Sequence, residues 1–328
     1  MGLLPFEKIK REVLVKKVVD TSDKFGCDPY ARPVSEILEY GIINLDKTKG
    51  PTSHQMSAYV QKAIGIKKSG HSGTLDPKVT GILPVALGKA TRVVQTLLIA
   101  GKEYVCLMHL HKEVDEEKIR KVFEEFTGKI TQLPPIKSAV KRQYRDRTIY
   151  YMDLLDIEGQ DVLFTVGCQA GTYIRKLCHD MGQKLGVGAH MHELRRTKAG
   201  PFKEDSLVSM HDLVDAYHFW KDEGKEEYIR KVIQPVERAV DHLPKVWVMD
   251  TSVNTICNGA DLAAPGIAKV ESGVEKNKTV AVMTLKDELV ALGMTKMSSE
   301  EMHEKEKGIA VKTKKVFMKI GTYPKVQK

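Results

Sequence analysis

The sequence contains no CxxC pair, and its five cysteines are widely spaced. An odd number of isolated cysteines supports neither a zinc ribbon nor a disulfide framework, so we expect a reducing, cytoplasmic setting. No apolar run is long enough to span a bilayer, and the first residues lack the apolar core of a signal peptide. The sequence therefore predicts a soluble protein with no membrane partner.

Two nucleotide-binding motifs are incomplete. Residues 88–91, Gly-Lys-Ala-Thr, resemble the end of a P-loop, but Leu83 occupies the position of the required upstream glycine. Residues 186–188, Gly-Val-Gly, begin a dinucleotide loop whose third glycine is replaced by Met191. Neither ATP nor NAD is predicted as a cofactor.

The spacing of four histidines gives little support for a metal site. His109 and His111 lie two positions apart, as do His190 and His192, so each pair would share one face of a strand. No paired Cys, Asp or Glu stands at ligand spacing, so we favour surface or hydrogen-bonded histidines and predict no metal.

The composition indicates a folded protein with a polyanionic partner. The 328 residues are 42% hydrophobic, which suits two domains or one large domain with an appendage. The 52 basic residues outnumber the 43 acidic ones and give a net charge of +9. Nucleic acid is the first candidate for the partner, and an anionic membrane surface is the second.

Residue periodicity predicts an arm, a large mixed domain and a small β-rich unit. Residues 1–35 form a charged arm with a strand-like segment at 13–15. Helices are expected after the Thr52–Gln55 capping box, from Asp115 to Gly128, from about residue 171 and over most of 208–231. Strands are expected at 40–46, 82–87, 104–110, 162–168 and 190–196. Four further short strands, at 246–249, 279–283, 288–292 and 308–311, suggest a small β-barrel-like domain.

Residues 70–81 present one carboxylate, Asp76, in a loop rich in glycine and hydroxyl groups. Gly70, Gly73 and Gly81 can adopt positive φ, and Pro77 disfavours a helix at Asp76. We therefore expect Asp76 on an ordered turn, as a nucleophile, a base or only a turn-former.

Residues 133–147 read as a long basic loop with an aromatic residue, Tyr144. Its cations are candidates for RNA contacts, because phosphate would relieve their mutual repulsion and a base could stack on tyrosine. A merely solvated loop is the alternative. The candidate RNA-binding residues are Lys137, Lys141, Arg142, Arg145 and Arg147.

Three separated motifs, in order, resemble a known family. Residues 73–81 resemble the catalytic motif of the TruB family of RNA pseudouridine synthases. The longer segment 71–81, with 101–105 and 170–177, resembles the RNA-guided, dyskerin-like branch, the catalytic subunits of H/ACA ribonucleoproteins. The resemblance runs from about residue 33 to the end, and the absence of long lysine-rich tails is typical of archaeal members. The basic loop departs from the family, which usually has more arginine there.

This resemblance implies an α+β fold and a domain plan. The catalytic domain, residues 36–242, would hold a mixed, largely antiparallel sheet. Residues 243–328 would form a small β-barrel PUA domain that binds RNA, and the arm, residues 1–35, would pack on that domain.

The resemblance also implies the isomerisation of uridine to pseudouridine in rRNA, or in tRNA, without a cofactor. Asp76 would be the nucleophile, Tyr104 would stack on the target base and help remove the C5 proton, and Arg175 would pair with Asp76. The residues implied to line the substrate pocket are Tyr173, Leu194 and His71.

The partners implied by the resemblance are a guide RNA, a target rRNA and three small proteins. These proteins are a zinc-ribbon-like or linear one, a glycine- and arginine-rich one and a kink-turn binder. A stand-alone tRNA pseudouridine synthase is the nearest alternative, and guide dependence separates the two. A non-catalytic RNA scaffold, in which Asp76 only shapes a turn, is the alternative from another class.

Overall fold

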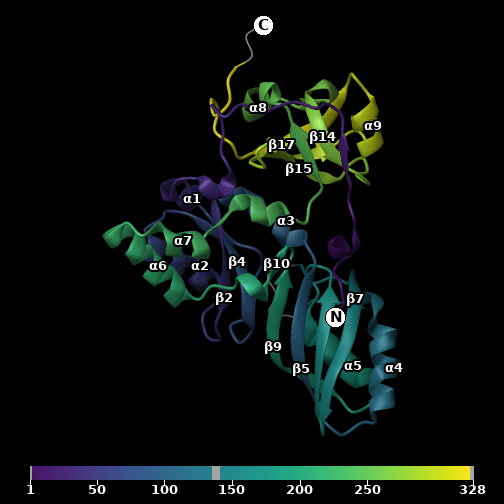
Figure 1. Ribbon diagram of the computed structural model, residues 1–328. Helices are drawn as coiled ribbons and strands as arrows, with labels where there is room; N and C mark the ends of the chain where they lie inside the picture. The colour runs from purple at the N-terminus through teal and green to yellow at the C-terminus, as the bar shows by residue number, and fades with distance from the viewer. Residues whose placement is uncertain (1, 135–140, 326–328) are drawn as a thin grey trace.

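The computed structural model describes residues 2–134 and 141–325, which form a larger unit and a smaller unit, each built on one sheet. Figure 1 shows the smaller unit, green to yellow, seated on one end of the larger one. Of the helices in these residues, none has the length and apolar character needed to cross a bilayer.

The larger sheet is mixed. Its strands are β2 (Gly41–Lys47), β3 (Ser69–His71), β4 (Thr80–Leu87), β5 (Lys102–Leu110), β6 (Gly128–Gln132), β7 (Arg145–Glu158), β8 (Asp161–Cys168), β9 (Ala189–Ala199), β10 (Phe202–Lys203) and β11 (Gln234–Pro235). They follow the order β11-β2-β4-β9-β5-β8-β7-β6, with β3 paired to β4 and β10 to β9. The β4–β9 ladder is parallel and joins Thr80 to Arg195 and Gly81 to Arg196, whereas β2–β4, β5–β9 and β5–β8 are antiparallel. The predicted α+β class, with a largely antiparallel sheet, is confirmed.

Most helices belong to the larger unit, and α8 and α9 belong to the smaller one. They are α1 (Val34–Tyr40), α2 (Ser53–Ile64), α3 (Val94–Ile99), α4 (Glu116–Phe126), α5 (Ile174–Lys184), α6 (Met210–Glu223), α7 (Glu226–Val232), α8 (Asp250–Cys257) and α9 (Ser299–Glu304). The predicted capping box of α2 is present, since Thr52 and Gln55 exchange side-chain to backbone hydrogen bonds of 2.8 and 3.2 Å. The predicted helix after Asp115 is α4.

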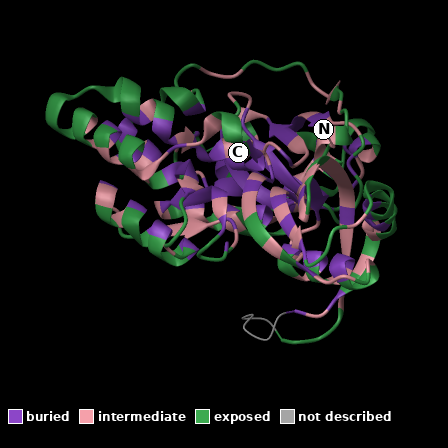
Figure 2. Cartoon of the chain, turned by 90° about the horizontal axis from the view of Figure 1, so that it is seen from below, coloured by how far each residue is buried: buried purple, intermediate pink, exposed green. Residues whose placement is uncertain are grey.

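One core lies between α4, α5 and the sheet. Ile119 and Phe123 of α4 and Leu177 of α5 pack against Cys106 of β5 and Phe164 of β8. Apolar residues at helical spacing on α4 meet alternating apolar residues on the strands, so burial of this face holds the layers together. Figure 2 shows the buried residues gathered between the layers and the exposed ones on the outer helices.

The smaller sheet curls into a half-barrel. Its strands are β1 (Val13–Val15), β12 (Lys245–Val248), β13 (Leu262–Ala263), β14 (Ile267–Glu271), β15 (Thr279–Met283), β16 (Leu289–Thr295) and β17 (Ile309–Val316), in the order β1-β14-β12-β15-β16-β17-β13. The four predicted strands are β12, β15, β16 and β17. Strand β14 was not predicted, because residues 267–271 contain Ala, Lys and Glu, which are depleted in strands. Helices α8 and α9 were not predicted either.

A second core is shared by the two units. Ile82, Leu97 and Phe202 of the larger unit pack in one cluster with Trp247 and Phe317 of the smaller one. The units are thus joined by buried apolar surface as well as by the chain between them.

The N-terminal arm contacts both units. Strand β1 adds an edge to the smaller sheet, with Val13 opposite Glu271 and Val15 opposite Lys269. Ahead of β1, Leu4 is fully buried, and a Glu7 carboxylate oxygen lies 3.2 Å from the ammonium of Lys198 on β9. Figure 1 shows the arm, in purple, running alongside the smaller sheet.

The predicted long basic loop is partly wrong. Strand β7 begins at Arg145, and Arg147 pairs with Ile130 of β6. Charged side chains at this end of the sheet can face solvent without breaking the ladder, so their charge did not mark a loop. The expected positive φ of Gly70 is also wrong. Gly70 lies in β3 and does not have positive φ.

Candidate active site

Asp76 lies on an ordered turn between β3 and β4, as predicted. The backbone N–H of Val79 donates to the carbonyl of Asp76 at 2.9 Å, with Pro77 second in the turn. Gly81, at φ +97°, closes the loop where β4 meets β9, and a Cβ there would lie 2.3 Å from the Arg196 carbonyl oxygen. The Asp76 side chain is half exposed and so can meet a ligand from outside.

A buried lysine holds the loop from beneath. The side chain of Lys47, at the end of β2, is fully buried. Its ammonium donates to the carbonyls of Thr48, Pro77 and Val79 at 3.0, 3.1 and 2.7 Å. Burial and then the nearby positive charge of Arg196 lower the pKa of Lys47. Two of the three acceptors lie one and three residues after Asp76, so Lys47 fixes the backbone that carries Asp76.

Ser53, at the start of α2, holds the other side of Asp76. Its hydroxyl accepts from the Leu75 N–H at 2.9 Å and lies 3.3 Å from the Leu75 carbonyl oxygen, and both residues are buried. The backbone is thus bound on both sides of Asp76, while the Asp76 side chain itself stays exposed.

Arg196 of β9 holds the loop at its two ends. It is 1% exposed, and its guanidinium donates to the carbonyls of Ile82 and Gly73 at 2.7 and 3.3 Å. We did not single out Lys47, Ser53 or Arg196 from the sequence. The available signal for Arg196 was the alternation of β9, which places it on the same face as Leu194.

Arg175 forms an ion pair with Asp76, as predicted, across 99 positions in the chain. It lies in the first turn of α5, whose start is held by Gln132. The Gln132 amide accepts from the Tyr173 N–H at 3.0 Å and donates to the Tyr173 carbonyl at 3.2 Å. A guanidinium paired with a carboxylate fixes the direction in which that carboxylate points.

Tyr104 and Leu194 lie on the neighbouring strands β5 and β9. Tyr104 is directly opposite Arg196, and Leu194 is opposite Cys106. Both side chains are partly buried and belong to the margin of the core beneath α5. Burial raises the pKa of the Tyr104 phenol, while the charge and hydrogen bond of Arg196 lower it. Tyr104, Arg196 and the Asp76 loop therefore form one connected group.

His71 lines a separate small pocket. This pocket, about 310 Å³, lies between α2 and β3, and the rings of His71 and His54 meet edge to face with centroids 4.9 Å apart. Burial and then the neighbouring His54 lower the pKa of His71. Neither Asp76 nor Arg175 lines this pocket, so His71 and the Asp76–Arg175 pair do not share it.

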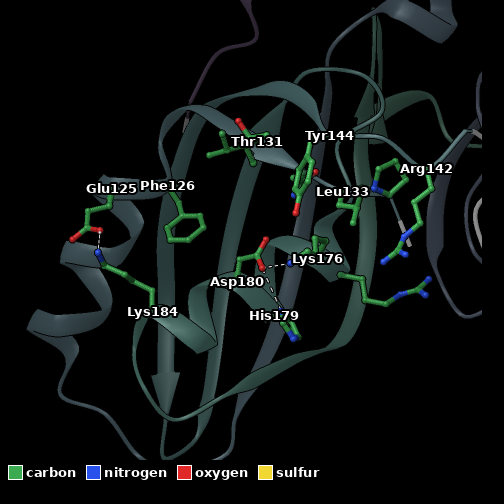
Figure 3. Close-up of a pocket in the computed structure, with 14 residues that line it drawn as sticks. Glu125, Phe126, Thr131, Leu133, Arg142, Tyr144, Lys176, His179, Asp180 and Lys184 are labelled. Carbon is green, nitrogen blue, oxygen red and sulfur yellow. Dashed lines mark hydrogen bonds and ion pairs between the residues drawn. The ribbon is translucent and has the colours of Figure 1, made fainter. Parts of the chain in front are cut away.

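A larger cavity of about 990 Å³ opens beside Arg175 (Figure 3). Phe126 of α4 and Tyr144 give it apolar walls, while Lys176 and Asp180 of α5 pair within it. Asp76 is not among its lining residues. Arg175 is thus shared between the cavity and the carboxylate.

The predicted RNA-binding cations are only partly gathered. Lys137 lies outside the described residues. Lys141 and Arg142 are exposed, and Arg142 lines the large cavity. Arg145 and Arg147 lie on β7, where the Arg147 guanidinium donates to the Asp146 carbonyl at 2.7 Å.

Within residues 2–134 and 141–325, no group of three or more His, Cys, Asp or Glu side chains has the arrangement of a metal site. The histidine pairs do meet across β5 and β9, with His111 Nε2 3.1 Å from His190 Nδ1. His109 Nδ1 lies 2.8 Å from an Asp161 carboxylate oxygen, so this ring nitrogen is already engaged in a hydrogen bond.

The mixed sheet with an attached half-barrel unit matches the class of RNA pseudouridine synthases. Family models match residues 4–57 (DKCLD domain), 61–174 (TruB family pseudouridylate synthase, N-terminal domain), 175–241 (tRNA pseudouridylate synthase B C-terminal domain) and 244–317 (PUA domain). A relative from Thermococcus onnurineus, named probable tRNA pseudouridine synthase B, is 61% identical over 99% of this chain and 97% of its own length. The chain therefore belongs to the TruB family of pseudouridine synthases and is an isomerase.

Other relatives agree with this assignment. The probable tRNA pseudouridine synthase B of Pyrococcus abyssi is 59% identical over 99% of this chain and 97% of its own length. A chain in a solved Cbf5-Nop10-Gar1 complex has 59% identity and a TM-score of 0.95, and 99% of each chain is covered. A chain in an H/ACA ribonucleoprotein bound to a substrate RNA containing 2'-deoxyuridine has 57% identity and a TM-score of 0.93, again covering 99% of each.

Proposed function

We propose that this chain is the catalytic subunit of an H/ACA ribonucleoprotein and isomerises uridine in rRNA at positions chosen by a guide RNA. The support is the similarity, over 99% of both chains, to proteins solved as a Cbf5-Nop10-Gar1 complex and as an H/ACA ribonucleoprotein with substrate RNA. The partners would be the guide RNA, the target and small proteins, among them counterparts of Nop10 and Gar1. The cytoplasmic setting expected from the unpaired cysteines stays a prediction.

The ion pair of Arg175 with Asp76 carries the catalytic proposal. Both side chains are about half exposed, so the pair adds little to folding stability, about 1 kcal/mol or less. Its value lies in chemistry, because it directs a carboxylate on the exposed side of a loop whose backbone is hydrogen-bonded to the residues beneath it.

In the proposed reaction the C1′–N1 bond of uridine breaks, the uracil turns and C5 bonds to C1′. Asp76 is the nucleophile, and the target nucleotide is turned out of its strand to reach it. Tyr104 stacks on the base and assists loss of the C5 proton to N1. The atoms and the oxidation state of the nucleotide are conserved, so the reaction requires no redox cofactor and no ATP.

The remaining proposed pocket residues surround this centre. Tyr173 is the N-cap residue of α5, two residues before Arg175, and Leu194 lies on the β9 face shared with Arg196. His71 lines the pocket next to the loop, so we assign it to the RNA strand beside the target nucleotide rather than to the target itself.

RNA would lie across both units. Lys141, Arg142, Arg145 and Arg147 are proposed to contact phosphates near the cavity, and the PUA domain to hold the guide RNA through backbone and shape. The proposed functional division is residues 1–35 as the arm, 36–242 as the catalytic domain and 243–328 as the PUA domain.

Release of tritium from RNA labelled at uridine C5 tests the proposal. We expect release by the wild-type complex and none by Asp76→Asn, with RNA binding retained. Asp46→Asn is the matched control, since Asp46 pairs with Arg195 at 3.1 Å on β2. Normal release by Asp76→Asn would remove Asp76 as the nucleophile.

A stand-alone tRNA pseudouridine synthase is the second candidate, because the relatives carry the name probable tRNA pseudouridine synthase B. The same assay, with tRNA and no guide RNA or partner protein, distinguishes them. Full activity without a guide would favour this second candidate.

A further inference from the structure

Arg196 is a cation in the interior of the larger unit. Its side chain is 1% exposed, and the described residues contain no carboxylate in ion-pair contact with it. The adjacent Arg195 differs, because it is partly exposed and pairs with Asp46 and Glu204 at 3.1 and 2.6 Å. Burying an uncompensated charge is costly, so a position that retains one needs a reason beyond packing.

Two carbonyls account for part of the hydrogen-bonding capacity of Arg196. The Nε donates to Ile82 at 2.7 Å and an Nη donates to Gly73 at 3.3 Å. These acceptors lie on either side of Asp76, three residues before it and six after. One planar guanidinium therefore sets the spacing between the two ends of the carboxylate loop.

Tyr104 lies on the other side of Arg196. The two residues are directly opposed in the antiparallel pairing of β5 and β9, which puts both side chains on one face. Burial raises the pKa of the Tyr104 phenol above its usual value, and the charge and hydrogen bond of Arg196 offset part of that rise. The same cation thus binds the backbone of the loop that carries Asp76 and acts on the Tyr104 hydroxyl.

We propose that Arg196 is a positioning residue that fixes the Asp76 loop relative to Tyr104 and holds positive charge at the Tyr104 hydroxyl. This inference rests on the proposed role of Tyr104. The neutral Met side chain would fill the space of Arg196 but neither bind the two carbonyls nor polarise the phenol. Lysine would keep the charge yet lacks the planar fork that spans Gly73 and Ile82.

The first test measures the phenol without turnover. A fluorinated tyrosine placed at position 104 of the full chain reports its own ionisation by ¹⁹F NMR. We expect Arg196→Met to raise the pKa at position 104 by about 1, and Arg196→Lys to leave it near the wild-type value. Cys168, the other titratable group acting on Tyr104, is the same in every variant. An unchanged pKa in folded Arg196→Met would overturn the electrostatic part.

The second test is a double-mutant cycle in the tritium-release assay with guide and target RNA. We expect Arg196→Met to lower kcat about 100-fold with little change in KM, and Arg196→Lys to recover part of the loss. In a Tyr104→Phe background the same substitution should cost clearly less, because the hydroxyl on which it acts is gone. Arg195→Met is the control, for which we expect near wild-type kcat.

Equal losses in both backgrounds would overturn the link to Tyr104. If Arg196→Met fails to fold, Arg196→Lys still decides the proposal, since wild-type kcat in that variant would show that the carbonyl spacing has no effect. Failure of the proposed function is separate, because it would appear as normal turnover by Asp76→Asn, whereas the ¹⁹F titration needs no turnover.

Discussion

Arg32 and Glu237 lie 205 positions apart and form a two-pronged ion pair, with nitrogen–oxygen distances of 2.9 and 2.8 Å. Their side chains are 9% and 11% exposed. Glu237 also accepts from the Leu289 N–H at 2.8 Å, and Arg32 lies 3.9 Å from Glu288. The arm, the catalytic domain and the PUA domain meet at this buried pair.

Removing Arg32 should destabilise the whole chain. Arg32→Ala leaves the Glu237 carboxylate buried without its partner, so we expect the free energy of unfolding to fall by about 3–5 kcal/mol in urea titrations. Lys89→Ala is the control, because its 3.0 Å pair with Glu39 is exposed and should contribute about 1 kcal/mol or less. Equal losses of unfolding free energy in the two variants would contradict the conclusion that the buried Arg32–Glu237 pair stabilises the contact between the arm and the two domains.

Removing Arg175 should affect chemistry and leave folding intact. The pair with Asp76 is half exposed, so Arg175→Ala should melt within a few degrees of the wild type. Without the guanidinium the carboxylate is less well directed, and we expect tritium release to slow about 100-fold. Arg120→Ala on α4, which breaks an exposed pair with Glu116, is the matched control and should release tritium normally. Unchanged release by Arg175→Ala would exclude Arg175 from the site.

His242 should make the fold sensitive to acid. Its ring is buried against Phe6, with centroids 6.0 Å apart, and burial lowers the pKa of His242 from 6.5 to about 4. Between these values the unfolded chain binds the proton and the folded chain does not. Stability is therefore fully present above pH 6.5 and is lost as the pH falls toward 4.

The size of this loss follows from the two pKa values and is about 3 kcal/mol. Urea unfolding at several pH values should show that His242→Leu loses less stability than the wild type between pH 6.5 and 4. His218→Leu, at an exposed histidine paired with Asp222, is the control and should follow the wild type. Parallel curves for His242→Leu and wild type would contradict the prediction.

Lys141 should contribute to RNA affinity through charge. Lys141 is exposed, and it directly follows residues 135–140, which lie outside the described residues. Lys141→Glu should weaken RNA binding and make the slope of log affinity against log salt shallower by about 1. Lys118→Glu, at an exposed lysine of α4, is the control. A slope equal to that of the wild type would leave Lys141 without a role in binding.

Strong local patterns made much of the fold predictable. The apolar run of β4, the alternation of β5 and the periodicity of α4 are local signals of burial, and each predicted the observed element. Strand β7 was missed at its start because Arg145 and Arg147 carry charges typical of a loop, while the pairing with β6 that makes them a strand is not local.

The residues of the site also differ in how far the sequence reveals them. Asp76, Tyr104 and Arg175 were selected through the motifs around them, and their roles stay predictions. The residues that hold the loop act on backbone carbonyls, which every residue possesses, so the sequence carries no matching partner for Lys47 or Arg196 to reveal the contact. Only the fold shows that these cations turn inward.

The apolar cluster shared by Ile82, Leu97, Trp247 and Phe317 bears on how the protein loses its structure. Separating the two domains would expose both sides of that cluster to water, so neither domain retains its full stability alone. Family models divide the chain at residues 241 and 244, yet we expect calorimetry to record one cooperative melting transition. The boundary between two family domains therefore does not separate two units that unfold independently.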